Sequence, residues 1–171
     1  MIIWISGLSA SGKTTIGAAL TQILRDEGRP VVFLDGDVLR NVWQDKLGYS
    51  LEDRRINARR ISYLCNMLES QYINVVTAVL YPFPEWISWN RENARQFYLT
   101  LLDVPMPTLE SRDPKGLYAD ARAGKVRNVV GVDIEFDRSS NPDKILFNGE
   151  PLRDPKDLAL AIRADLPNFI E

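Results

Sequence analysis

Five short runs of the chain are almost continuously apolar and rich in β-branched or aromatic residues. They are IIWIS (2–6), PVVFLD (30–35), INVVTAV (73–79), QFYLTLLDV (96–104) and, more weakly, KILFN (144–148). Runs that lack polar alternation are typical of buried strands in a parallel sheet whose two faces are both covered. We therefore expect a parallel sheet of about five strands.

The segments between these runs follow a helical period. Apolar residues recur every three or four positions over 13–27 and 51–71, and a third helix is expected over 155–166, where Pro155 suits a first turn. Alternating strands and helices predict an open α/β sheet with right-handed crossovers. The length of 171 residues suits a single domain over 1–171.

Two stretches depart from this alternation. VLYPFPEW (79–86) ends a strand in two prolines and three aromatic residues, which favours either the rim of a binding site or a packed corner. The stretch 112–128 carries five basic residues, and we expect a short mobile helix there. Its charges favour either a solvated face or a lid that closes cations over phosphates. The tail 135–171 carries no motif beyond a closing strand and a packing helix.

Composition removes several classes of function. Histidine is absent and Cys65 is the single cysteine, so His-based triads, His-ligated zinc and internal disulfides are excluded. Cys65 falls in an apolar helical pattern and is expected in the core. The net charge of −2 offers no global basic field for nucleic acid.

The N-terminus MIIWISGL lacks the basic start of a secretory signal, and no apolar run approaches the length of a membrane span. We expect a cytoplasmic protein with neither a membrane nor a nucleic-acid partner.

The segment GLSASGKT (7–14) matches the phosphate-loop pattern G-x-x-x-x-G-K-[ST], between a predicted strand and a predicted helix. Its glycines let backbone N–H groups surround a phosphate at the positive end of the helix. Lys13 is expected to reach the β- and γ-phosphates of a nucleotide, and Thr14 to ligate Mg²⁺. A chance Gly/Ser turn is the alternative, but the flanking elements favour triphosphate binding.

Carboxylates follow the second predicted strand, in LDGD (34–37). If the strand continues through Gly36, Asp35 and Asp37 point to the same side and can orient an acceptor hydroxyl and hydrated Mg²⁺. Arg40, about one helical turn further on, can hold an anionic group of the acceptor. The alternative is a Gly turn with capping aspartates.

Several of these motifs, taken together with LGYSLEDRRINARR (47–60) and RDPKGLYADARAG (112–124), resemble the adenylyl-sulfate kinases. The likeness extends from the N-terminus to about residue 133. It implies a phosphate-loop NTPase-type sheet flanked by helices, a mobile basic lid and a homodimer. The implied reaction transfers the γ-phosphate of ATP, with Mg²⁺, to the ribose 3′-hydroxyl of adenylyl sulfate, a step of sulfate assimilation.

The resemblance also assigns roles to residues. Lys13, Asp35 and Asp37 are the expected catalytic residues, and Thr14 the metal ligand. Expected ATP-binding residues are Gly7, Ser9, Ala10, Ser11, Gly12, Lys13, Thr14, Thr15 and Arg112. Expected acceptor-binding residues are Asp37, Arg40, Tyr49, Arg54, Asn57, Leu80, Tyr81, Lys115 and Val129. Tyr49 takes the place of a family Phe that stacks on the acceptor base.

The sequence leaves the family pattern on the acceptor side. Tyr81 stands where the family has a serine, Pro84 where it has an arginine, and Val129 where the lid ends in a stacking Phe. Losing one ring removes roughly 1–3 kcal/mol of base stacking. Adenylyl sulfate is the first expectation, and another conjugate such as cytidine diphosphoramidate is the alternative. A non-catalytic nucleotide-binding regulator is a third hypothesis, which the complete set of catalytic candidates weakens.

Overall fold

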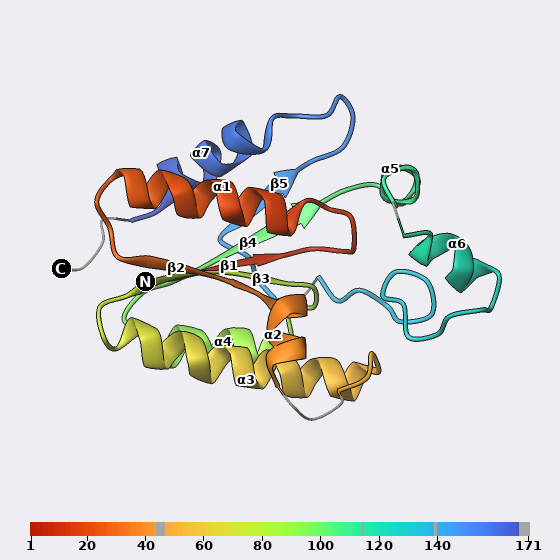
Figure 1. Ribbon diagram of the computed structural model, residues 1–171, viewed down its shortest axis with the longest axis horizontal. Coiled ribbons are helices and arrows are strands. Elements are labelled where there is room, and N and C mark those ends of the chain that lie inside the picture. The colour runs from red at the N-terminus through yellow and green to blue at the C-terminus, as the bar shows by residue number, and fades with distance from the viewer. Residues whose placement is uncertain (44–46, 114, 139, 168–171) are drawn as a thin grey trace.

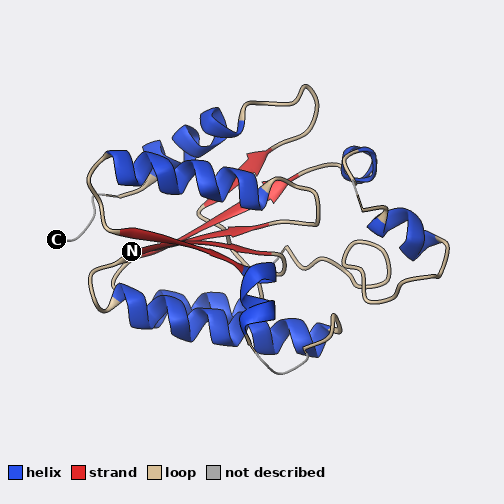
Figure 2. Cartoon of the chain, viewed as in Figure 1, coloured by secondary structure: helices blue, strands red, loops and turns tan. Residues whose placement is uncertain are grey.

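The computed structural model describes residues 1–43, 47–113, 115–138 and 140–167. Its centre is one parallel sheet with the strand order β2-β3-β1-β4-β5, drawn in red in Figure 2. The strands are β1 (Ile2–Ser6), β2 (Val31–Asp35), β3 (Asn74–Val79), β4 (Phe97–Asp103) and β5 (Lys144–Phe147). Each predicted strand is confirmed to within one residue at either end.

Helices cover both faces of this sheet (Figure 1). On one face α1 (Lys13–Asp26) and α7 (Pro155–Asp165) pack together, and on the other lie α3 (Leu51–Glu69) and α4 (Pro84–Asn93). Each face of the sheet has its own apolar core. Every residue of β1 is buried, and alternate side chains of the strand belong to one core or the other. Among the described residues, no helix is long and apolar enough to cross a bilayer.

The proline-rich run 79–86 forms the corner between β3 and α4. β3 ends at Val79, and Pro84 then opens α4, where its missing N–H would have no helical partner in any case. Phe83 is buried in this corner, so the packed-corner interpretation holds for that side chain. The sequence pattern does not predict α4, since two nearby prolines conceal its first turn.

Three short helices lie toward the carboxyl end of the sheet, two of them, α5 and α6, on the right of Figure 1 and α2 near its middle. They are α2 (Gly36–Val42), α5 (Met106–Ser111) and α6 (Leu117–Arg122). Gly36 lets α2 begin directly at the strand end, because a Cβ there would lie 2.9 Å from the Ala78 carbonyl oxygen. Segments distant in sequence thus converge where ligands bind in open α/β sheets.

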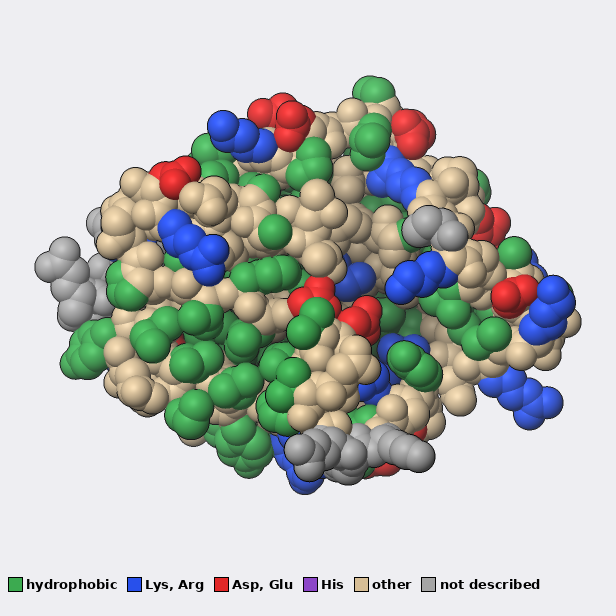
Figure 3. Space-filling model, viewed as in Figure 1, with side chains coloured by type: hydrophobic (Ala, Val, Ile, Leu, Met, Phe, Trp, Pro, Cys, Tyr) green, Lys and Arg blue, Asp and Glu red, His purple; other side chains and the backbone are tan. Residues whose placement is uncertain are grey.

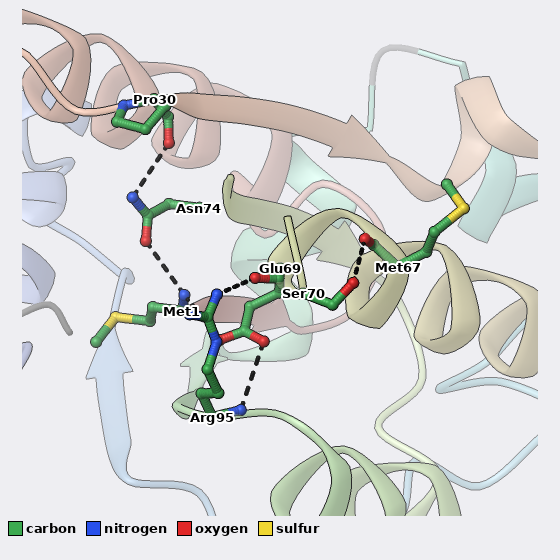
Figure 4. A network of polar contacts seen from close by, with 7 residues as sticks. All are labelled: Met1, Pro30, Met67, Glu69, Ser70, Asn74 and Arg95. Carbon is green, nitrogen blue, oxygen red and sulfur yellow. Dashed lines mark hydrogen bonds and ion pairs between the residues drawn. The ribbon is translucent and has the colours of Figure 1, made fainter. Parts of the chain in front are cut away.

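Charged groups close the opposite end of the sheet (Figure 4). The buried Glu69 carboxylate lies 3.3 Å from the Arg95 guanidinium and 3.3 Å from the Met1 amino group. Asn74 accepts a hydrogen bond from that amino group and donates one to the Pro30 carbonyl. These contacts satisfy a carboxylate that would otherwise be costly to bury.

Leu20 tests the core beneath α1. Its side chain is fully buried against the sheet, so Leu20→Ala should lower the free energy of unfolding by about 2–5 kcal/mol, as cavity-forming substitutions do. Urea titration followed by circular dichroism measures the change. Leu160→Ala on α7, where the side chain is 45% exposed, is the matched control and should stay within about 0.5 kcal/mol. Equal losses in the two variants would contradict the core assignment.

Candidate active site

A cavity of about 760 Å³ opens at the carboxyl end of the sheet. Its walls come from the phosphate loop, α2, the start of α3, the residues after β3, and the segment 112–130. Figure 3 shows acidic and basic side chains side by side near α2, on this side of the molecule. The topology thus brings together groups that the sequence separates by more than a hundred positions.

The phosphate loop has the backbone shape of an anion cradle. Ala10 (φ 61°) and Gly12 (φ 96°) both adopt left-handed conformations, and Gly12 is the N-cap of α1. When left-handed and right-handed backbone conformations alternate in this way, successive N–H groups point toward one centre. That centre lies at the positive N-terminal end of α1, a helix of 14 residues. The backbone of the loop therefore has the conformation that the motif predicts.

Lys13 lies in this loop beside two carboxylates. Its ammonium donates a hydrogen bond to the Leu8 carbonyl at 2.7 Å. Burial lowers the pKa of Lys13 from 10.5 to about 8, although the negative charges of Asp37 and Asp35 oppose that fall. The loop lysine is thus an ammonium held in a poorly solvated place, where an anion would stabilise it strongly.

The two aspartates do not share the face of one strand, and that expectation was wrong. β2 ends at Asp35, which becomes the N-cap of α2 and accepts hydrogen bonds from the N–H groups of Asp37 (2.9 Å) and Val38 (3.2 Å). Its other oxygen accepts from the Thr14 hydroxyl at 2.6 Å. Asp37, in the first turn of α2, is exposed on the cavity wall.

A pair of arginines forms another part of the cavity. The guanidinium groups of Arg40 and Arg54 lie 5.0 and 5.6 Å from the centre of the Tyr49 ring. Arg54 also donates to the main-chain carbonyl of Asn128, at 2.9 Å. Its pKa is lowered, first by burial and then by the positive charge of Arg40. The two neighbouring guanidinium groups offer several N–H donors to an anionic group in the cavity.

The remaining acceptor-side residues line the cavity in different ways. Asn57 is buried, with its amide already bonded to the Gly36 carbonyl and to the Trp43 indole. Tyr81 is also buried and lies beside Phe83, with ring centres 4.5 Å apart. Leu80 and Val129 complete this apolar part of the wall.

The basic segment 112–128 contributes part of its charge to the cavity. Its basic residues at the wall are Arg112, Lys115 and Arg127. Arg122 and Lys125 instead form surface ion pairs with Glu110 and Asp120. The segment is therefore partly the cation-bearing wall and partly the solvated face that the sequence left as alternatives.

Gly7 and Ser11 are the two predicted site residues that do not line the cavity. Ser11 is buried behind the loop, and a Cβ at Gly7 would come 2.8 Å from the Ser11 hydroxyl, so both shape the loop from behind. The sequence did not point to several residues that do line it, among them Asn41, Asp113, Asp120 and Asn128. Hydrophobic periodicity carries no signal for polar residues that only the folded topology brings together.

Comparison with known proteins identifies the family of the chain. The family model for adenylylsulphate kinase matches residues 1–146. The chain belongs to the adenylyl-sulfate kinase family. The family expected from the motifs is thereby confirmed, and the protein is a nucleotide 3′-hydroxyl kinase.

Individual adenylyl-sulfate kinases match over most of the chain. The enzyme of Gloeothece citriformis is 39% identical over 141 residues, which cover 82% of this chain and 80% of the relative. An adenylyl-sulfate kinase of Mycobacterium tuberculosis, solved with AMPPNP and adenylyl sulfate, is 33% identical with a TM-score of 0.86 over 95% of each chain. A hexameric adenylyl-sulfate kinase of Thiobacillus denitrificans, 20% identical with a TM-score of 0.65, shares the fold over 95% of this chain and 28% of its own.

The pKa of Lys13 predicts a pH dependence for nucleotide binding. Below pH 8 the free loop holds an ammonium, and above it the lysine loses the proton that the phosphates require. Affinity for ADP should therefore fall about fivefold from pH 8 to pH 9, with proton uptake on binding, as linkage requires. Isothermal titration calorimetry in two buffers measures both quantities. Lys13→Met should bind ADP weakly, and its affinity should not fall between pH 8 and pH 9. If the fall persists in this variant, the pH dependence belongs to another group.

Proposed function

We propose that the protein transfers the γ-phosphate of ATP to the ribose 3′-hydroxyl of adenylyl sulfate. The observation that carries the proposal is that one cavity is lined by the loop lysine, a carboxylate and a pair of arginines. Lys13, Asp37 and the arginine pair all line this cavity, and the charge of Asp37 opposes the lowering of the pKa of both Lys13 and Arg54. A phosphate donor at the loop and an anionic acceptor at the arginines would meet beside this carboxylate.

Mg²⁺ fits the oxygen groups beside the loop. The Thr14 hydroxyl and the Asp35 carboxylate are 2.6 Å apart, and Mg²⁺ is bound in such sites by one or two carboxylates, waters and substrate phosphates. Thr14 would hold the ion directly and Asp35 a water of its shell. When bound, the ion would neutralise charge on the transferred phosphoryl group.

The hydrogen bonds separate the roles of the two aspartates. Both oxygens of Asp35 already accept bonds, from the start of α2 and from Thr14. Within the described ranges, no donor bonds to the carboxylate of Asp37, which faces the cavity. We therefore assign Asp37 as the group that accepts the proton of the acceptor hydroxyl, and Asp35 as the group that holds the loop threonine.

The acceptor would lie across Tyr49 and the arginines. The phosphate–sulfate anhydride of adenylyl sulfate is anionic and suits the site of Arg40 and Arg54, where two cations repel each other. Tyr49, with 58% of its surface exposed, offers a ring for the acceptor base. Because a second aromatic ring is missing at Val129, this proposal rests on the anion site more than on stacking.

The names of the compared relatives support adenylyl sulfate and give no support to a cytidine conjugate or a non-catalytic regulator. The cytoplasmic location and the homodimer stay predictions.

The acceptor is tested by incubating the protein with ATP, Mg²⁺ and one of several nucleotides, and following phosphate transfer by ³¹P nuclear magnetic resonance. We expect a new 3′-phosphate on adenylyl sulfate. 3′-Deoxyadenylyl sulfate, which lacks the accepting hydroxyl, is the matched control and should gain none. Transfer to cytidine diphosphoramidate alone would replace the proposed acceptor, and bound ATP without transfer to any nucleotide would overturn the kinase assignment.

Asp37→Asn tests the proton-accepting role. The amide keeps the size of the side chain but cannot take a proton, so kcat should fall by about 10²- to 10⁴-fold. The Kd for ATP should change by less than about threefold, because the loop and Thr14 are untouched. Asp26→Asn, an exposed carboxylate at the far end of α1, is the control and should keep full activity. Undiminished turnover in Asp37→Asn would rule out this assignment.

A further inference from the structure

The carbonyl groups of the phosphate loop are held from outside the loop. The hydroxyl of Tyr118, in α6, donates to the Ser9 carbonyl at 2.9 Å. The amide of Asn148, directly after β5, donates to the Ser11 carbonyl at 3.0 Å. Two segments more than a hundred residues away therefore bond to alternate residues of the loop.

These bonds act on the orientation of the peptide groups. A peptide plane that turns its N–H toward a phosphate turns its carbonyl the opposite way. A buried carbonyl that points away from the phosphate needs a hydrogen-bond donor. Without one, rotation of the peptide plane toward another donor becomes favourable. Tyr118 is 1% exposed and Asn148 5% exposed, so water does not readily replace either side chain.

We propose that Tyr118 and Asn148 are positioning residues that hold the phosphate loop in its phosphate-receiving shape. Neither lines the cavity, so both act through the loop and not by contact with the nucleotide. The inference rests on the proposed use of ATP and does not depend on the acceptor.

Two further contacts support this role for Asn148. Its amide nitrogen would lie 3.0 Å from a Cβ at Gly12, so the side chain is fitted closely to the loop. Its amide oxygen is buried without a bond to any described residue, a loss that an apolar side chain would avoid. The hydrogen bond that the Asn148 amide donates to the Ser11 carbonyl, and not apolar packing, therefore explains why an amide side chain stands here.

The same contacts join the lid segment to the loop. Arg112 donates to the main-chain carbonyls of Asn148 (2.8 Å) and Gly149 (3.1 Å), while the N–H of Tyr118 donates to the Asp113 carboxylate at 2.7 Å. The base of the lid and the segment after β5 thus form one support behind the loop. Movement of the lid at its base would disturb the bonds to Ser9 and Ser11.

Tyr118→Phe and Asn148→Ala remove the two donors separately. Each should raise the Kd for ATP about fivefold, as expected for one lost hydrogen bond. Calorimetric titration without acceptor measures this. In steady-state assays KM for ATP should rise by a similar factor, while kcat changes less than twofold. In Asn148→Ala the bond from Arg112 remains, because it goes to the main chain.

Tyr98→Phe is the matched control. It removes the hydroxyl of another buried tyrosine, on β4 in the core beneath α1 and α7, and should leave the Kd for ATP unchanged. Lower melting temperatures with unaltered affinity in the two loop variants would show a merely structural role and overturn the inference. If Tyr118→Phe does not fold, Asn148→Ala decides alone. Failure of the unaltered chain to bind ATP would instead count against the proposed function.

Discussion

A loop that binds phosphate with its N–H groups must present its carbonyl groups to the rest of the protein, and this requirement organises the carboxyl end of the sheet. The carbonyls of Leu8, Ser9 and Ser11 each accept a bond from a side chain, from Lys13, Tyr118 and Asn148 respectively. Each donor belongs to a different part of the chain. In the proposed support, α6 and the segment after β5 therefore hold the phosphate loop from behind.

Electrostatic imbalance gives the same cavity its affinity for anions. Lys13 and Arg54 both have lowered pKa values, with burial as the first cause in each case. Poorly solvated cations gain more from a bound anion than cations in water do. The negative charge of Asp37 offsets part of this positive charge.

The sequence predicted the sheet well because continuous apolar runs leave few alternatives for five strands. It predicted the phosphate loop and Arg40 from motif and context. It placed Asp35 and Asp37 on one strand face only if the strand continued through Gly36, whereas Gly36 starts a helix that Asp35 caps, the alternative that the sequence also allowed. It also missed Asn148, because a single buried amide after an edge strand does not change the hydrophobic periodicity of the sequence. Local patterns specify elements, whereas contacts between elements specify the site.

Tyr81 shows how the acceptor side differs from the phosphate side. Its ring lies against Phe83 and Phe136, and its hydroxyl accepts a bond from the N–H of Asp137 at 3.3 Å. The same side chain lines the cavity, so one residue is part of the core and of the acceptor wall at once. A change in acceptor shape here requires repacking of the corner between β3 and α4. The proline-rich run after β3 is therefore both a packed corner and a part of the cavity wall.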